Sequence, residues 1–515
     1  MKRTRERVEI DMAELRRALE RGRREPIGEA DYEKLKVALD VLDERLRPTR
    51  TTEKTRTVVE QPKLVNGGGS TVADGGEPVA RKGHGRNGAG TYTGAQKVVI
   101  PAKLAGGDAC PECARGRVYP QRPKTLVRVV GQAPVEATVY EMERLRCNAC
   151  GQVFTAETPE GVDRDKYDAT AAAMIAQLKY GTGVPFTRLE RMQGQVGIPL
   201  PAATQWELVE QAAAVLKPAF EQLISEAAQG EVLHNDDTGM RILQLAREPS
   251  DERTGVFTSG IVSACRDHKI ALFFTGRQHA GENLADVLKQ RAGEIRSPIQ
   301  MCDALSRNTP KLTNGVQILL ANCIAHGRRQ FVDVAASFPS ECGYVLETLG
   351  MVYGNEAWTR EQSLDAETRL RFHQQYSGPL LEQLHAWLRE QLDGAKTEPN
   401  SGLGRAMSYL LKHWQALTLF LREKGAPLDN NVCERALKKA ILNRKNALFY
   451  KTPNGAMVGD LFMSLIHTCE LNGVNSFRYL TELQRHRAEV KQTPADWMPW
   501  NYTAALAGAR SPVAA

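Results

Sequence analysis

The sequence predicts a multidomain α/β protein, and three observations support this class. The chain has 515 residues, too many for one hydrophobic core, which indicates two to four domains. Hydrophobic residues make up 42% and charged residues 25%, as in ordinary folded proteins. After Gly230, short strand-like runs alternate with helix-like runs, and long helical stretches flank them on both sides. A sheet-containing domain between helical segments follows from this order.

The first 100 residues predict a helical region followed by a linker. Leucines at spacings of three and four, such as Leu15, Leu19 and Leu35, predict helices in residues 1–60 that could mediate oligomerisation. Residues 61–100 are rich in glycine and basic residues, which indicates a linker without a packed core. The cations of this linker could follow a DNA backbone, or the segment could be a plain solvated tether.

The chain carries no sign of membrane insertion or export. No apolar run approaches the roughly 18 residues of a membrane-spanning helix, and the charged N-terminus lacks an apolar signal region. We therefore expect a cytoplasmic protein. The net charge of +7 is modest, so evidence for nucleic-acid binding must come from local clusters of cations.

Two C-x-x-C pairs predict a zinc module within residues 101–158. The pairs are Cys110 with Cys113 and Cys147 with Cys150. Strand-like runs at 125–130 and 136–140 lie between them, and four such thiolates suit one tetrahedral structural Zn²⁺. The alternative is two unrelated cysteine pairs, but the ten cysteines of a large cytoplasmic chain favour thiols and metal ligation over disulfides.

Residues 160–228 predict a helical region with a helix-turn-helix-like arrangement. Ala169–Tyr180 forms one amphipathic stretch, and Phe186 to Met192 marks a short helix. A turn at Gly197 and a second helix from Ala203 follow, which is the order of a DNA-binding helix-turn-helix. A plain helical hairpin fits the same spacing.

Residues 229–332 predict the first part of an RNase H-like core. The expected elements are the strands Glu231–Asn235, Val256–Ala264 and Ile270–Thr275, the helix Ala280–Arg291, and the strands Pro298–Cys302 and Val316–Ala321. Three strands followed by alternating helix and strand is the order of RNase H-like α/β folds. Asp236 and Asp303 each end a strand-like run, and carboxylates at strand ends converge at one edge of such sheets.

Helix-like sequence dominates the stretch between Asp303 and Glu434. So much helix cannot belong to the sheet itself, so residues 333–427 are interpreted as a large helical insertion into the core. Residues 428–470 should complete the core, and residues 471–515 form a C-terminal segment.

Glu434 opens a predicted helix and is followed by cations. From Arg435 to Gly459 there are six Lys or Arg and no Asp or Glu. Asp236, Asp303 and Glu434, in this order, indicate a two-metal centre for phosphoryl transfer on a polyanion such as DNA. Such oxygen ligands suit Mg²⁺, and thiols do not.

Each of these residues also has a structural interpretation. Asp236, Asp237 and Asp303 could cap turns, and Glu434 could form a capping box with Asn431 as its cap. His326, with Arg328 and Arg329, could be a core histidine beside a solvated helix face, or the three could contact phosphates near the active site.

At several ordered segments the chain resembles the transposases of the insertion sequence 66 family, which are of the DDE type. The segments are Gly83-His84-Gly85-Arg86-Asn87-Gly88, the four-cysteine module, Asp236-Asp237-Thr238, Cys323-Ile324-Ala325-His326-Gly327-Arg328-Arg329-Gln330-Phe331, Asp429-Asn430-Asn431 through Glu434-Arg435, Arg444-Lys445-Asn446, Leu471-Asn472-Gly473-Val474 and Trp500-Asn501.

The resemblance implies specific roles for the acids. It makes Asp236, Asp303 and Glu434 catalytic ligands of two Mg²⁺ (or Mn²⁺) ions. The family usually has Asp-Glu-Thr where this chain has Asp236-Asp237-Thr238, so Asp237 remains an alternative first ligand. The family often has Gly and Tyr after the second Asp, where this chain has Ala304-Leu305.

The resemblance also implies an activity and partners. The expected activity is DNA transposition, in which terminal inverted repeats are bound, cut and joined to target DNA in the bacterial cytoplasm, at the nucleoid. A homo-oligomer is implied, and accessory proteins of the same element could assist. The expected DNA-binding residues are His326, Arg328, Arg329, Arg435, Lys438, Lys439, Arg444 and Lys445. The rival interpretations are a DNA-binding regulator or inactive remnant, and an RNase H-like nuclease or resolvase.

Overall fold

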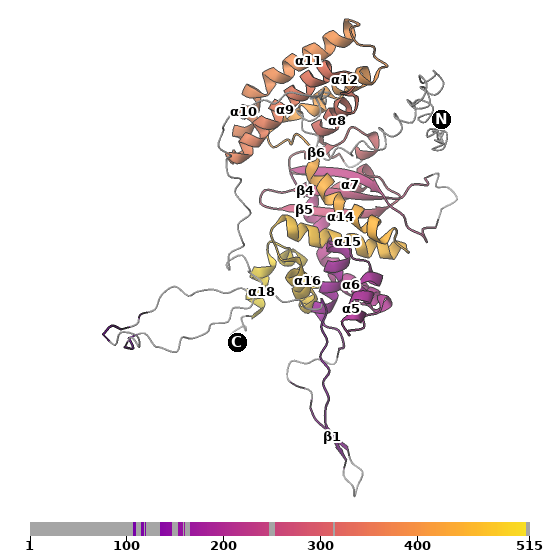
Figure 1. The fold of residues 1–515 in the computed structure, drawn as a ribbon, viewed down its shortest axis with the longest axis vertical. Coiled ribbons are helices and arrows are strands. Elements are labelled where there is room, and N and C mark those ends of the chain that lie inside the picture. The colour runs from indigo at the N-terminus through magenta and orange to yellow at the C-terminus, as the bar shows by residue number, and fades with distance from the viewer. Residues whose placement is uncertain are drawn as a thin grey trace, which may run out of the picture.

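The computed structural model describes residues 165–246, 253–312 and 315–510, together with short segments between 107 and 159. The predicted N-terminal helices, the linker and the four cysteines of the zinc module lie outside the described residues. In the described ranges the chain is a mixed α/β protein with one five-stranded mixed sheet and many helices (Figure 1). None of the helices described is both long enough and apolar enough to span a membrane.

The five-stranded sheet has β3 at its centre. Its spatial order is β5 (Lys269–Gly276), β4 (Phe257–Ala264), β3 (Val232–Gly239), β6 (Ile299–Cys302) and β7 (Leu319–Asn322). β4 runs antiparallel to both β3 and β5, whereas β6 runs parallel to both β3 and β7. Ile261 and Leu272 are fully buried, because apolar side chains along these strands pack under helices on both faces.

Two helices pack on the central strands from opposite faces. Gly260 of β4 faces α14 (Asn431–Ala447), since a Cβ added there would lie 2.9 Å from Leu437. Ser259, the next residue, faces α7 (Ala280–Leu288), where Asn283 donates a 2.8 Å hydrogen bond to its hydroxyl. Side chains therefore alternate along this part of the sheet between an α14 face and an α7 face.

The exposed edge of β5 is covered by α15 (Pro453–Leu471). Side chains at four-residue intervals along this helix accept hydrogen bonds from the outward-facing backbone N–H groups of alternate β5 residues. The pairs are Asp460 with Thr275, Ser464 with Phe273, Thr468 with Ala271, and Asn472, just past the helix, with Lys269. The helix thus closes an edge that would otherwise offer unpaired donors to another chain.

Helices form a second layer at one end of the sheet (Figure 1). They are α8 (Ile324–Val334), α9 (Pro339–Glu361), α10 (Ala366–Tyr376), α11 (Gly378–Asp393), α12 (Gly402–Lys412), α13 (Trp414–Leu417) and η4 (Leu419–Leu421). Their apolar faces enclose a core that includes Phe331, Leu384 and Phe420, separate from the core under the rest of the sheet. This helical unit stands between Asp303 and Glu434 in the chain.

The opposite end of the sheet is covered by helices from both sides of the sequence. They are α4 (Ala169–Ala176), η2 (Gln177–Gly181), α5 (Phe186–Gln195), α6 (Ala202–Ala228), α16 (Ser476–Arg485), α17 (Arg487–Gln492), η5 (Pro494–Trp497) and α18 (Tyr502–Arg510). The helix expected at Ala169–Tyr180 is α-helical only to Ala176 and then widens into a π-helical turn.

α6 is the second helix of the helix-turn-helix-like arrangement expected in residues 160–228, and α5 is the first. The α6 helix is 27 residues long, and its buried face, which includes Val209, Leu216 and Leu223, belongs to the main core. Its exposed side carries Glu207 and Glu221, and the latter forms an ion pair with Lys217 at 3.6 Å.

Two short strands, β1 (Arg144–Arg146) and β2 (Val153–Thr155), pair antiparallel within the predicted zinc module. The strand expected at 136–140 is wrong, because this segment is not a strand, pairs with none of the strands described, and has exposed side chains. The strand-like run expected at 125–130 lies outside the described residues.

Candidate active site

Asp236 and Asp303 meet where two parallel strands separate. Asp236 does not end its strand as expected: pairing with β4 continues to Gly239, but pairing with β6 stops at His234. Asp303 directly follows β6. Beyond these last paired residues the two neighbouring backbones diverge, which leaves space for both carboxylates.

Asn308 links the two aspartates. It ends the short η3 helix (Ser306–Asn308) and is fully buried. Its Nδ2 lies 2.5 Å from Asp303 Oδ1 and 3.3 Å from Asp236 Oδ1. Its backbone carbonyl accepts hydrogen bonds from Asn235 at 2.8 Å and Gln300 at 2.7 Å. These contacts fix the amide between the carboxylates.

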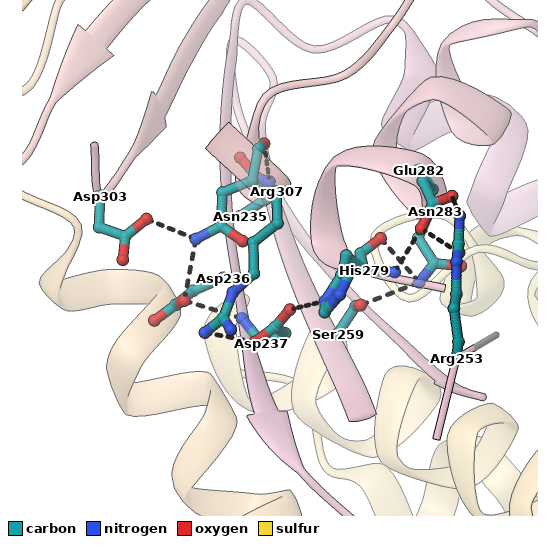
Figure 2. A network of polar contacts seen from close by, with 11 residues as sticks. Asn235, Asp236, Asp237, Arg253, Ser259, His279, Glu282, Asn283, Asp303 and Arg307 are labelled. Carbon is teal, nitrogen blue, oxygen red and sulfur yellow. Dashed lines mark hydrogen bonds and ion pairs between the residues drawn. The ribbon is translucent and has the colours of Figure 1, made fainter. Parts of the chain in front are cut away.

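The structure separates Asp236 from Asp237. Figure 2 shows the Asp236 carboxylate on the side of Asp303 and the Asp237 carboxylate on the side of His279. Asp236 pairs in register with Gly260, so its side chain projects on the α14 face, whereas Asp237 projects on the α7 face. The Asp237 carboxylate is 1% exposed and pairs with His279 Nδ1 at 2.9 Å and with Arg307 at 3.4 Å.

Negative charge accumulates at the Asp236 carboxylate. Burial raises its pKa to about 6, and the neighbouring Asp303 adds to the rise, although the Asp237 N–H bonded to Asp236 Oδ1 at 2.8 Å opposes it. Burial raises the pKa of the nearby Cys302 thiol, and the charges of Asp303 and Asp236 raise it further, so this thiol is not a nucleophile. A bound cation would relieve the repulsion between the carboxylates.

Glu434 lies in the first turn of α14, and its helix is anchored beside Asp236 by Asn430. The fully buried Asn430 side chain donates to Asn235 O at 3.1 Å and lies 3.1 Å from His234 Nδ1. The Asn430 N–H also bonds to Cys323 Sγ at 3.2 Å, which joins the start of α14 to the start of α8. This contact places the Asn430-Asn431 and Cys323-to-His326 segments side by side.

The capping-box interpretation of Glu434 is wrong. Asn430, not Asn431, precedes the helix, and its side chain makes no capping hydrogen bond because it is bonded to β3 instead. The Glu434 carboxylate is 35% exposed, with its Oε1 3.8 Å from His326 Nδ1. This carboxylate is therefore accessible from solvent, with His326 as its neighbour.

His326 connects Glu434 with the aspartates. It lies in the first turn of α8, close enough to Asp236 for its charge to lower the pKa of that carboxyl. Among the described residues, Cys323, His326 and Glu434 form a group whose ligand atoms all lie within 4.8 Å of one another. Glu434 thus lies next to His326, and Asp236 and Asp303 lie next to each other. The two aspartates and the glutamate therefore approach the site from different sides. Burial raises the pKa of the Cys323 thiol to about 11, which disfavours a thiolate ligand.

The donor set fits divalent cations. The carboxylate oxygens of Asp236, Asp303 and Glu434 are hard ligands of the kind that Mg²⁺ prefers. In addition, Asn308 Oδ1 is buried without a hydrogen-bond partner in the described part of the chain. Such an orphaned acceptor beside two acids would be satisfied by an ion-bound water.

The cations expected to bind DNA divide into two groups on α14. Arg435, Lys438 and Lys445 are exposed on one helix face, and none has an ion-pair partner among the described residues. Lys439 is instead bonded to Gly181 O at 3.0 Å and Glu470 at 2.7 Å. Internal contacts of this kind make Lys439 a structural residue.

Arg444 also has an internal role, since it bonds to Gly239 O and, at 3.2 Å, to the Thr238 hydroxyl. On α8, Arg329 is exposed and Arg328 is half-buried. Arg444 therefore supports β3, the strand that carries Asp236. The exposed cations of the expected set lie on α8 and on α14, the two helices that border the acids.

Sequence reasoning did not identify the roles of Asn308 and Asn430. Asn430 belongs to the Asp429-Asn430-Asn431 motif, so its position just before Glu434 could have indicated a role in the site. For Asn308, the only indication in the sequence is its position soon after Asp303.

The geometry defines an α/β protein with paired acids at the point where two parallel strands separate, and comparison with known proteins identifies its family. The sequence profile of the transposase IS66 family matches residues 165–458, which is more than half of the chain. The chain belongs to the IS66 family of transposases.

Similar proteins are known from Sinorhizobium fredii strain NGR234. The uncharacterized protein y4hP is 26% identical over 75% of this chain and 71% of its own length. The uncharacterized protein y4jD is 26% identical over 71% of this chain and 72% of its own length. A third, y4qI, is 25% identical over 64% and 62% of the two chains.

Proposed function

We propose that this chain is a DDE transposase that cleaves the ends of its mobile element and joins them to target DNA. The observation that carries the proposal is the juxtaposition of Asp236 and Asp303, linked by Asn308, with Glu434 on a helix that packs on the same face of the sheet. The sheet order β5-β4-β3-β6-β7, with β4 antiparallel, supports an RNase H-like core for this chemistry.

In this proposal Asp236, Asp303 and Glu434 hold two Mg²⁺ or Mn²⁺ ions. Bound at this site, the ions would activate the attacking water or 3′-hydroxyl and stabilise the leaving oxygen. Asn308 orients the two aspartates, and Asn430 holds Glu434 at a fixed position relative to β3. His326 and the exposed cations of α14 would bind the phosphates that flank the scissile bond.

Recognition of the element's ends is assigned to the N-terminal part of the chain. The module that contains Cys110, Cys113, Cys147 and Cys150 and the helix-turn-helix-like region of α5 and α6 are the parts expected to bind terminal inverted repeats. One structural Zn²⁺ per chain is expected in the four-cysteine module, and elemental analysis of purified protein tests it. A homo-oligomer acting on paired ends in the bacterial cytoplasm completes the proposal, with or without accessory proteins of the same element.

Cleavage and joining assays on end DNA with Mg²⁺ test the catalytic proposal. Asp236→Ala, Asp303→Ala and Glu434→Ala should each abolish cleavage but leave DNA binding intact, because each removes a metal ligand. Asp237→Asn is the matched control and should retain cleavage, since Asp237 faces α7. Activity in all three alanine variants would refute the proposal, and nicking without joining would favour a nuclease.

A further inference from the structure

A large groove lies far along α14 from Glu434. Its volume is about 1220 Å³, and it is bounded by the starts of α5 and α6 and by the connection from α14 to α15. Trp206, Leu448 and Phe449 contribute apolar surface, and Arg188 of α5 and Lys451 of the connection from α14 to α15 contribute cations. Trp206 packs near the start of α15, since a Cβ added at Gly455 would lie 4.0 Å from its ring. None of these residues belongs to the acid site.

Two apolar side chains at this groove are held toward solvent. Leu448, the C-cap residue that follows α14, has φ 67°, a left-handed conformation that non-glycine residues rarely adopt outside helix ends. It is 65% exposed, and the adjacent Phe449 is 38% exposed. Tyr450 fixes the chain just beyond, because its N–H bonds to Arg241 O at 2.8 Å and its carbonyl accepts from Leu243 at 2.9 Å. Exposed apolar side chains that border a groove are typical of a binding surface.

The surrounding charge indicates that the ligand is an anionic polymer. Arg188 and Lys451 are exposed and have no ion-pair partner in the described part of the chain. The exposed face of α14, with Arg435, Lys438 and Lys445, leads from Glu434 to the groove. The groove lining includes one acid, Glu210, which accepts a hydrogen bond from Asn454, so the cations Arg188 and Lys451 still outnumber it. Apolar and aromatic surface bordered by cations is the usual composition of sites that bind unstacked nucleotides.

The length of α14 sets the spacing between the two sites. At 1.5 Å per residue, Glu434 and Ala447 are separated by about 20 Å along the helix axis. This corresponds to roughly six nucleotide steps of 3.4 Å on one strand. A strand bound along α14 would therefore reach the groove a few nucleotides from the scissile phosphate.

We propose that this groove binds unstacked bases of the DNA strand that passes along α14, with Leu448 and Phe449 contacting their faces. The assignment of the strand rests on the proposed function, but base binding itself does not require catalysis. Removing the base from the duplex would hold the element's end in an open form during cleavage.

Fluorescence anisotropy with the full chain, without divalent metal, tests base binding directly. The probes are labelled (dT)12 and a 12-unit abasic strand with the same phosphates. Wild-type protein should bind (dT)12 more tightly, and the Leu448→Ala/Phe449→Ala double variant should lose about 10-fold in affinity for (dT)12 alone. Met351→Ala, an exposed apolar residue on α9, is the matched control and should change neither affinity.

Equal wild-type affinity for the two probes would overturn the proposal, and so would an equal loss for both probes in the double variant. If the double variant fails to fold, as judged by circular dichroism, the single Phe449→Ala variant and the wild-type comparison decide the question. Mg²⁺-dependent cleavage is measured separately. Base-dependent binding without cleavage would refute the proposed catalysis but support base binding by the groove. Cleavage without base-dependent binding would support the proposed catalysis and refute base binding by the groove.

Discussion

Asp236 and Asp303 occupy equivalent positions on neighbouring parallel backbones, each two residues beyond the last paired residues, His234 and Met301. Side chains at equivalent positions of adjacent parallel strands project from the same face. Two acids at this register therefore meet without any long-range loop having to place them. Because their like charges oppose this approach, the site depends on a neutral donor between them, and Asn308 supplies it.

Asn308→Ala should weaken the use of metal more than the binding of DNA. Loss of the amide that orients both aspartates should raise the Mg²⁺ concentration needed for half-maximal cleavage by about 10- to 100-fold. Titration of Mg²⁺ in the cleavage assay measures this shift. Asn355→Ala, which removes an amide bonded to Ser377 in the helical layer, is the control and should leave the Mg²⁺ requirement unchanged. A fall in thermal stability with an unchanged Mg²⁺ requirement would make Asn308 purely structural.

The two kinds of cation on α14 should differ in their effect on salt dependence. Arg435→Ala/Lys438→Ala should weaken binding to any DNA and reduce the slope of log affinity against log salt by up to about two, since each lost phosphate contact removes about one unit. Lys439→Ala should leave the slope unchanged, because its ammonium is bonded to Gly181 and Glu470. Anisotropy at several salt concentrations measures both variants. An unchanged slope in the double variant would mean that this face does not contact DNA.

The stability of the sheet edge should depend on pH through Asp460. Burial raises the pKa of this carboxyl to about 7, and its hydrogen bonds from Thr275 only partly oppose the rise. The folded state keeps its proton between about pH 4 and 7 whereas the unfolded state releases it, so this group lowers the unfolding free energy as pH rises through that window. Asp460→Asn should remove this pH-dependent loss of unfolding free energy. The stability of the variant relative to wild type should therefore increase from pH 4 to pH 7. Urea midpoints at pH 4, 5.5 and 7.5 measure the difference, and a constant difference would show that Asp460 is already ionised when folded.

The sequence was most informative where local pattern decides structure. The apolar runs of β4, β5 and β6 lie within a residue or two of their expected positions, because buried strands need continuous apolar sequence. Periodicity could not show that β3 continues past Asp236, since that extension depends on pairing with β4. In the same way, Lys438 and Lys439 look alike in sequence, and only the packing of α14 near Glu470 separates them.

For the site, sequence order could propose Asp236 but could not exclude Asp237. That choice requires the register with β4, which sets the face of each side chain. The roles of Asn308 and Asn430 were similarly hidden, because both act through partners that are distant in sequence or contribute backbone atoms.

The helical layer should depend on Glu356, whose side chain is 7% exposed and contacts three cationic or ionisable groups. Burial alone would raise its pKa, but hydrogen bonds from His373 and Arg369 and the charge of Arg360 outweigh it and hold the pKa at about 2. The stabilisation is therefore fully present above the ordinary Glu pKa and is lost as pH falls toward 2.

Glu356→Ala leaves His373, which is fully buried, and Arg369, which is largely buried, without their shared acceptor. The variant should lose about 3–5 kcal/mol of unfolding free energy, as expected when one partner of a buried ion pair is removed. Glu367→Ala is the matched control, because its exposed pair with Arg371 at 3.3 Å contributes about 0.5 kcal/mol or less. Urea unfolding followed by far-ultraviolet circular dichroism at pH 7 measures both variants. Equal, small losses would mean that Glu356 is replaceable and that the apolar core around Leu384 and Phe420 alone holds these helices together.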